Sequence, residues 1–106
     1  MRKKLSPRSA QPTLIFEASS KHSKVAHGRA NKGPTQGQAS LENSIQVKES
    51  SPRRVGIDPV TKEFVVFSRT INNIYHAHVR SWEELDEQMQ RCLIEHGMAT
   101  KSGRPL

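Results

Sequence analysis

The sequence predicts an α+β domain in which a helix near the C-terminus packs on one face of an antiparallel sheet of about four strands. Three observations support this fold class. Apolar and polar residues alternate in short segments between 45 and 80, as they do in half-buried strands. Turn-forming residues separate these segments. The last strand is followed at once by an amphipathic helical pattern with signals at both of its ends.

The first 20 residues predict a flexible basic arm that precedes a single domain of residues 21–106. They are rich in Ser, Pro, Lys and Arg and lack a periodic apolar face. The apolar run Leu14–Phe16 is a candidate for docking this arm on the domain. That run is too short for a signal peptide, and no apolar run reaches the ~18 residues that span a bilayer. We therefore expect no membrane-spanning segment.

Residues 21–38 hold three glycines and a proline, which favours an irregular loop. A short helix is expected to open near Gln36 and to end at about Asn43. The alternation of residues 45–48 then predicts a strand. We expect the segment 49–52 to end it, because Pro52 has no N–H to donate to a sheet.

Two hairpins are predicted after this strand. Residues 55–57 and 64–67 form the arms of the first hairpin, and residues 58–62 form its turn. Asn72 and Asn73 form the second turn, because asparagine tolerates positive φ angles. This turn leads into the strand NIYHAHVR.

The segment that begins at Ser81 predicts a single helix. Ser81 and Glu84 have the spacing of a capping box, and acidic residues gather in the first turn. Gly97 is expected to stop the helix. Apolar positions recur at helical spacing over this segment, at Trp82, Leu85, Met89, Cys92, Leu93 and His96.

Charge is distributed unevenly along the 106 residues, whose formal net charge is +7. Residues 1–54 hold 11 Lys and Arg against 3 acidic residues, whereas residues 55–106 hold 6 against 7. This asymmetry favours a polyanionic partner, and nucleic acid is a commoner one than an anionic membrane. The alternative is a basic tail that is merely solvated. Cys92 is the only cysteine, so the chain forms no internal disulfide.

Strand alternation divides the segment 75–80 into two rows. Tyr75, Ala77 and Val79 form one row, which we expect the C-terminal helix to cover. The other row then faces away from that core and consists of His76, His78 and Arg80.

This second row, the histidine row, has the chemistry that RNA cleavage requires. Two imidazoles titrate near neutral pH and supply a general base and a general acid. The guanidinium of Arg80 binds a phosphate and stabilises charge that develops on it. The alternative is that two surface histidines are ordinary polar residues on a solvated sheet.

Further basic residues are candidates for binding the RNA backbone. Arg53, Arg54 and Arg69 flank the first hairpin and are within reach of the same groove. The glycine-rich loop is able to fold over it, and its basic residues are Lys21, His22, Lys24, His27, Arg29 and Lys32. A solvated basic patch that only attracts nucleic acid is the competing interpretation for each of them.

Other chemistries fit the sequence less well. Zinc would need His22 and His27 beside the H-x-H pair, but these two are five residues apart and have no cysteine or carboxylate ligands nearby. The stretch from Gly28 to Gly33 imitates a phosphate loop, but Pro34 stands where lysine is required. No serine lies in a nucleophile elbow, and Cys92 is on the apolar face of the helix, where core packing is expected.

From about Lys21 to the end, the chain resembles the C-terminal toxin domains of bacterial contact-dependent-inhibition and filamentous-haemagglutinin-like exoproteins. The matching stretches are KHSKVAHGRANKGP, ASLENSIQVK, RRVGIDPVTKEFVVFSRT, IYHAHVRSWEEL and GMATKSGR. Such domains are similar to the barnase, EndoU, colicin and RelE group of metal-independent ribonucleases, in which helices pack on a four-stranded antiparallel sheet.

The resemblance implies an endoribonuclease that cleaves RNA, with tRNA as one candidate, and that needs no metal and no cofactor. It implies catalytic roles for His76, His78, His27 and Arg69. It also implies that His22 and Arg54 lie around the cleft. We expect them to bind substrate together with the basic residues described above, which are Lys21, Lys24, Arg29, Arg53 and Arg80. The resemblance also implies a monomer that acts in the bacterial cytoplasm and a cognate acidic immunity protein. The alternative function is a non-catalytic nucleic-acid-binding protein or a decayed toxin fragment.

Overall fold

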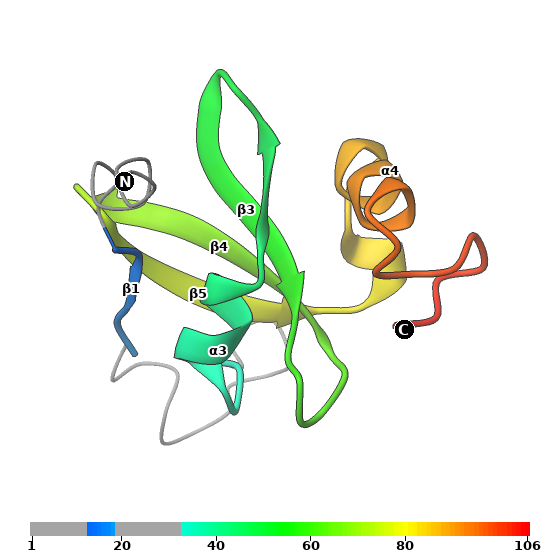
Figure 1. The fold of residues 1–106 in the computed structure, drawn as a ribbon, viewed down its shortest axis with the longest axis horizontal. Helices are drawn as coiled ribbons and strands as arrows, with labels where there is room; N and C mark the ends of the chain where they lie inside the picture. The colour runs from blue at the N-terminus through cyan, green and yellow to red at the C-terminus, as the bar shows by residue number, and fades with distance from the viewer. Residues whose placement is uncertain (1–12, 19–32) are drawn as a thin grey trace, which may run out of the picture.

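The computed structural model describes residues 13–18 and 33–106. Within them a sheet lies at the centre and α-helices pack against it (Figure 1). The elements in chain order are β1 (Ile15–Phe16), α3 (Gly37–Glu42), β2 (Ile45–Lys48), β3 (Ser51–Ile57), β4 (Phe64–Ile71), β5 (Ile74–Arg80), the 3-10 helix η3 (Trp82–Glu84) and α4 (Glu87–Glu95). This α+β architecture confirms the predicted fold class.

The sheet has five strands in the order β1-β5-β4-β3-β2. Strands β2 to β5 are antiparallel, as expected. In addition, β1 runs parallel to β5, with Ile15 opposite Ile74 and Phe16 opposite Tyr75. The expected docking of Leu14–Phe16 is therefore seen as a fifth, parallel edge strand. Residues 19–32 lie outside the described part of the chain, so the boundary at residue 20 stays a prediction.

The amide of Gln38 closes the outer edge of β1. Its Oε1 accepts a hydrogen bond from the Phe16 N–H, and its Nε2 donates to the Leu14 carbonyl, each at 2.8 Å. The Phe16 ring lies against the backbone of Gly37, where any side chain would overlap it. Residues of α3 therefore hold β1 in place through hydrogen bonds and through shape.

The sequence predicted that Pro52 lies in a linker, but Pro52 lies inside β3. β3 begins at Ser51, which stands opposite Lys48. The pairing of β3 with β4 starts only at Arg54, and the register with β2 shifts just after Gln46. A proline is tolerated at such a bulged, half-paired position because it lacks an N–H.

Asp58, which is 0% exposed, organises the predicted turn between β3 and β4. Its Oδ1 accepts hydrogen bonds from the Val60 and Thr61 N–H groups at 2.8 and 3.1 Å. Its Oδ2 accepts from the Gln36 N–H at 2.8 Å, which ties the turn to the start of α3. Burial raises the pKa of Asp58, but the N–H donors, with that of Thr35 among them, outweigh burial and hold this pKa below its ordinary value.

The second turn also forms as predicted, and Asn72 has a φ of +51°. The register of the β4–β5 ladder changes just before this turn. Arg69 is opposite Tyr75, but Ile71 is opposite Ile74, so one residue of β4 has no partner on β5. This irregularity is a β-bulge.

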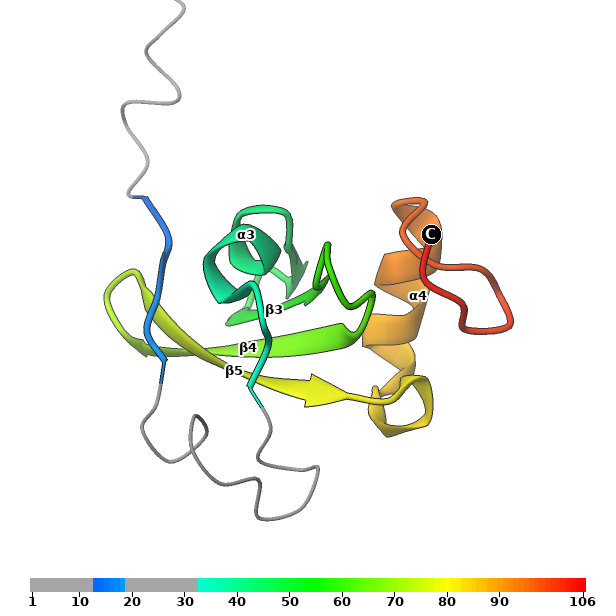
Figure 2. The same cartoon turned by 90° about the horizontal axis from the view of Figure 1, so that it is seen from below.

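Helices α3 and α4 pack on different parts of the sheet. Figure 2 shows α3 stacked on the strands β3 to β5, with α4 at the far end of the sheet. The cluster under α3 also receives Leu14 and Phe16, and its buried members are Leu41, Val65, Phe67, Tyr75 and Ala77. The cluster under α4 consists of Val55, Ile57, Phe64, Leu85, Met89, Leu93 and Ala99.

The single helix expected over residues 81–97 is two separate helices. Glu84 Oε1 accepts a hydrogen bond from the Ser81 N–H at 2.7 Å, as the capping box predicted. Leu85 then has an extended conformation with ψ 139°. Asp86 caps α4 by accepting a hydrogen bond from its third N–H at 2.8 Å. The break arises because an aspartate that bonds to the backbone ahead of it starts a helix in preference to continuing one.

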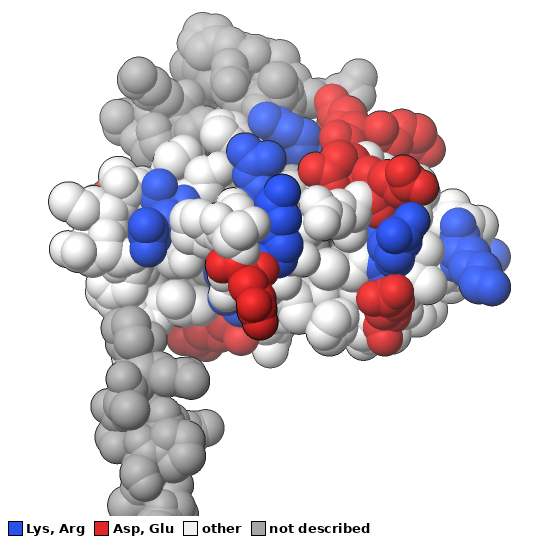
Figure 3. Space-filling model, turned by 90° about the horizontal axis from the view of Figure 1, so that it is seen from above, with Lys and Arg blue, Asp and Glu red and all other residues white. Residues whose placement is uncertain are grey.

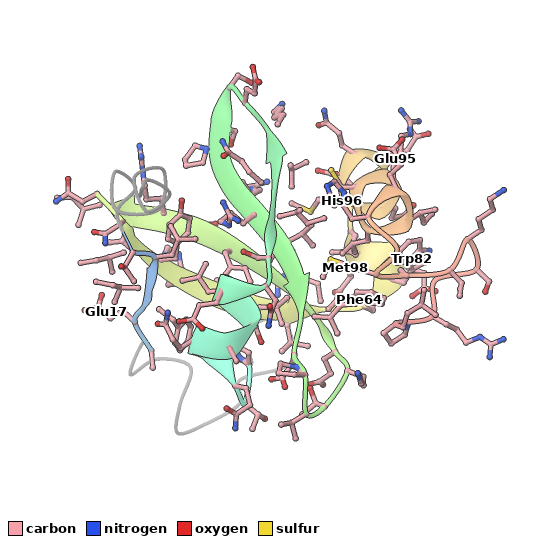
Figure 4. The ribbon with its side chains drawn as sticks, in the orientation of Figure 1. Glu17, Phe64, Trp82, Glu95, His96 and Met98 are labelled. Atoms are coloured by element: carbon pink, nitrogen blue, oxygen red, sulfur yellow. The ribbon has the colours of Figure 1, made fainter. Side chains whose placement is uncertain are left out.

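The C-terminal residues pack beside η3. The chain turns at Gly97, whose φ is +72°, and Ala99 pairs with Pro105 in an antiparallel bridge. The Phe64 and Trp82 rings have centroids 5.4 Å apart. Figure 4 shows both of them together with Met98 at the foot of α4. This contact holds η3 against β4.

Candidate functional site

The register places the histidine row on the same face of the sheet as α4. In the β4–β5 ladder Val66 is opposite His78, and Phe64 is opposite Arg80. Phe64 belongs to the apolar cluster under α4, and Val66 packs against it. Because directly opposite residues share a face, the row is on that face too. The expectation that α4 covers the other face of β5 is wrong.

The other face of β5 is covered by α3 and β1. Tyr75 and Ala77 are buried there together with Leu41. Alternation identified the two faces correctly, but it could not show which helix packs on each, because both faces are apolar in part. Under α4 the apolar surface lies on β2, β3 and β4 and is replaced on β5 by the histidine row.

An open groove follows the N-terminal end of α4 where this apolar surface ends. Its first cavity has a volume of about 320 Å³ and is lined by Arg53, Val66, Ser68, His78, Arg80, Glu84, Asp86 and Met89. Its second cavity, of about 390 Å³, is lined by Val47, Lys48, Ser50, Ser51, Arg53, Asp86, Gln88 and Met89. Three residues line both cavities, so the two are adjacent. We call them together the α4 groove.

The two histidines of the row are close to each other. The ring centroids of His76 and His78 are 5.9 Å apart and the ring planes meet at 86°. Both side chains are half-buried, and His78 lines the first cavity. Two imidazoles at this separation can serve one substrate, with one taking a proton and the other giving one.

Two arginines predicted to contact substrate also line the groove. Arg80 is half-buried, and its Nη1 donates a hydrogen bond to the Val79 carbonyl at 3.0 Å. Arg53 is exposed and lies where the two cavities meet. Lys48 lines the second cavity and was not among the predicted residues. Cationic groups are thus distributed along the whole groove.

Two other predicted arginines lie on the opposite face. Arg54 donates from Nε to Ser44 Oγ and from Nη2 to the Ser44 carbonyl, each at 2.7 Å. Burial lowers the pKa of Arg54, and the nearby Tyr75 opposes this shift. Arg69 is exposed and stands opposite Tyr75. Arg54 thus joins the end of α3 to the sheet, and the structure does not bring either arginine into the α4 groove.

The candidates in the glycine-rich loop lie outside the described residues. They are Lys21, His22, Lys24, His27 and Arg29. Their catalytic and binding roles stay predictions.

Sequence reasoning missed the acidic side of the groove. Glu84 and Asp86 both line the first cavity. In the sequence they appear only as acids in the first turn of a helix. Asp86 Oδ1 is occupied by its capping bond, whereas Oδ2 has no hydrogen-bond partner among the described residues. The Asp86 carboxylate therefore has an acceptor available to the groove.

Figure 3 shows one charged face of the molecule. Acidic side chains gather over the side on which α4 lies, and Lys and Arg side chains lie beside them over the middle of the molecule. The charges on this face are thus mixed.

In residues 13–18 and 33–106, no group of three or more His, Cys, Asp or Glu is arranged to hold a metal ion. His22 and His27, which a zinc site would need, lie outside that part. No helix in the described part of the chain is long and apolar enough to cross a membrane.

Cys92 has the environment of a packing residue. Its Sγ donates a hydrogen bond to the Val47 carbonyl at 3.6 Å. Burial raises the pKa of the thiol, and Glu95 and Asp86 raise it further. Since the thiolate is the nucleophilic form, this environment disfavours a catalytic role.

The fold and the groove define a small α+β protein with a polar site between a helix N-terminus and a sheet. The crystal structure of a CDI complex from Cupriavidus taiwanensis LMG 19424 contains a similar chain. The two share 54% sequence identity with a TM-score of 0.68, over 70% of this chain and 100% of that chain. No family model and no curated protein matches this sequence.

At this identity and coverage, the chain belongs to the family of contact-dependent-inhibition (CDI) proteins. Within that family it is a CDI toxin or a CDI immunity protein.

Proposed function

We propose that this chain is a CDI toxin and acts as a metal-independent endoribonuclease. The observation that supports this most directly is the His76–His78 pair, with ring centroids 5.9 Å apart. His78 of this pair lines a groove that Arg53 and Arg80 also line. RNA cleavage requires groups such as paired imidazoles beside arginines, whereas an immunity protein does not.

The reaction is an internal transesterification. One imidazole takes the proton of a ribose 2′-hydroxyl, and the 2′-oxygen attacks the adjacent phosphorus. The bond from phosphorus to the 5′-oxygen breaks, and the second imidazole, in its protonated form, gives its proton to that oxygen. The products are a 2′,3′-cyclic phosphate and a 5′-hydroxyl, and no metal is needed.

The arginines stabilise the charge on the phosphate. A phosphate beside His78 lies within reach of Arg80, which the Val79 carbonyl helps to hold in the groove. Fixed cationic donors aimed at a developing charge contribute much of the catalysis in such reactions. Arg53 and Lys48 then lie along the groove toward the neighbouring nucleotides.

The partners we propose are RNA and a cognate immunity protein. Asp86 Oδ2 offers an acceptor for an N–H group on a base edge, a contact that helps to position the RNA strand. The relative from C. taiwanensis was crystallised in a CDI complex, which supports a protein partner for this chain. We propose an acidic immunity protein, a monomeric toxin, and the bacterial cytoplasm as its site of action.

The test is incubation of the purified protein with total bacterial RNA in the presence of EDTA, followed by analysis of the RNA ends. We expect fragments with cyclic-phosphate and 5′-hydroxyl ends, formed at the same rate with EDTA as without it. Fragments with 5′-phosphate ends, or activity abolished by EDTA, would contradict the mechanism. Tight RNA binding with no cleavage would support the non-catalytic alternative.

A further inference from the structure

Thr70 occupies the β-bulge of β4. Ser68 is opposite His76, Arg69 is opposite Tyr75, and Ile71 is opposite Ile74, so Thr70 is the residue without a partner on β5. A bulge bends its strand and changes the direction of a side chain. Bulges are frequent beside active sites for that reason.

The Thr70 hydroxyl contacts His76. Thr70 Oγ1 lies 2.8 Å from His76 Nδ1, which is hydrogen-bond distance. With Nδ1 occupied, Nε2 is the ring nitrogen of His76 that remains for a substrate. The bulge thus brings a hydroxyl to Nδ1, while no described residue forms a hydrogen bond with Nε2.

We propose that Thr70 is a positioning residue that holds the His76 ring through Nδ1 and so directs Nε2 toward a substrate. The catalytic consequence rests on the proposed ribonuclease function, whereas the ring placement does not. A hydroxyl both donates and accepts, so it stays bonded to Nδ1 whether or not that nitrogen carries hydrogen. This suits an imidazole that takes and returns a proton through Nε2.

The competing explanation is that a β-branched residue simply fits a strand end. Two substitutions separate the explanations. Thr70→Val keeps the branched shape and removes the hydroxyl, whereas Thr70→Ser keeps the hydroxyl and removes the methyl group. If Thr70 positions the ring, Thr70→Val should have the larger effect. If its role is purely structural, Thr70→Ser should have the larger effect.

The first measurement uses the free protein and needs no activity. Side-chain ¹⁵N NMR of the histidines reports the protonation of each ring nitrogen. We expect Thr70→Val to change the His76 nitrogen shifts and Thr70→Ser to retain them. His96 is the internal control, because its Nδ1 lies 2.9 Å from the Cys92 carbonyl, a contact that neither substitution removes. Unchanged His76 shifts in Thr70→Val would overturn the inference.

The second measurement is kinetic. With RNA as substrate we expect Thr70→Val to lower kcat by roughly 10- to 100-fold at a similar KM, as loss of alignment does. We expect Thr70→Ser to stay near the parent. Equal losses in both variants would overturn the positioning role. If the parent itself cuts no RNA, the proposed function fails, and the NMR result alone decides whether Thr70 orients the ring.

Discussion

Val66 and His78 stand directly opposite each other on β4 and β5, and they mark the border between the core and the groove. Val66 packs against the cluster under α4, while both residues line the first cavity. The side of the sheet that faces α4 therefore both stabilises the fold and forms one wall of the candidate site. Changes in the core under α4 are expected to affect both stability and groove shape.

Leu93, which is 0% exposed, tests the packing of α4. Leu93→Ala should lower the free energy of unfolding by ~2–5 kcal/mol, because it leaves a cavity in the cluster under α4. Glu95→Ala, on the exposed side of the same helix, should change it by no more than ~0.5 kcal/mol. Denaturant titrations measure both values. Equal effects from the two variants would show that α4 does not seal the core.

Asp58→Asn should destabilise the fold in a pH-dependent way. Charged hydrogen bonds of this kind contribute ~1.5–3 kcal/mol, and the asparagine amide would place a donor against the Gln36 N–H. The pKa of Asp58 is lowered in the folded state, so its stabilisation is present above the unfolded pKa of about 3.9 and is lost as the pH falls through the folded pKa.

The measurement is the unfolding free energy of both proteins between pH 7 and pH 2. The difference between them should be largest near neutrality and should shrink steadily below about pH 4. A difference that does not depend on pH would indicate that the carboxylate charge plays no part.

Gly37→Ala tests the docking of β1. An added Cβ would overlap the Phe16 ring, so the ring must leave its place and β1 should loosen. In a Phe16→Ala background the same substitution has space and should cost much less. Unfolding free energies of the four proteins form a double-mutant cycle. Additive effects would mean that the two residues do not touch.

Arg53→Ala and Arg69→Ala form a matched pair, because both arginines are exposed but face opposite sides of the sheet. Arg53→Ala should weaken RNA binding and reduce the slope of log K against log salt by about one. Arg69→Ala should leave both quantities near those of the parent. Fluorescence anisotropy at several salt concentrations measures them. If Arg69→Ala has the larger effect on both quantities, the RNA binds on the α3 face of the sheet.

The strands and turns could be predicted because their signals are local. Alternation marked β2 to β5, and Asn72 and Asp58 marked the turns. The pairing of β1 with β5 could not be predicted, because two residues carry no periodicity and their partners are about 60 positions away. The break at Leu85 was also missed, since the apolar spacing continues across it.

The site could be predicted only for residues whose shared face follows from alternation within one strand. His76, His78 and Arg80 share a face whatever the fold. Arg53 and Arg54 are neighbours and must face opposite ways, so only the register to β4 shows which one joins the groove. Thr70 reaches the site because of a β-bulge, and Asp86 reaches it because α4 begins there. Tertiary structure sets both of these positions.

RNA cleavage by the histidine variants tests the central claim most directly. His76→Ala and His78→Ala should each lower kcat by at least ~100-fold in the presence of EDTA, while Arg69→Ala retains activity and all three stay folded by circular dichroism. The parent rate should fall at both low and high pH, because one group must be unprotonated and another protonated for the reaction. If His76→Ala and His78→Ala cut RNA as fast as the parent does, the histidine row is not the catalytic site.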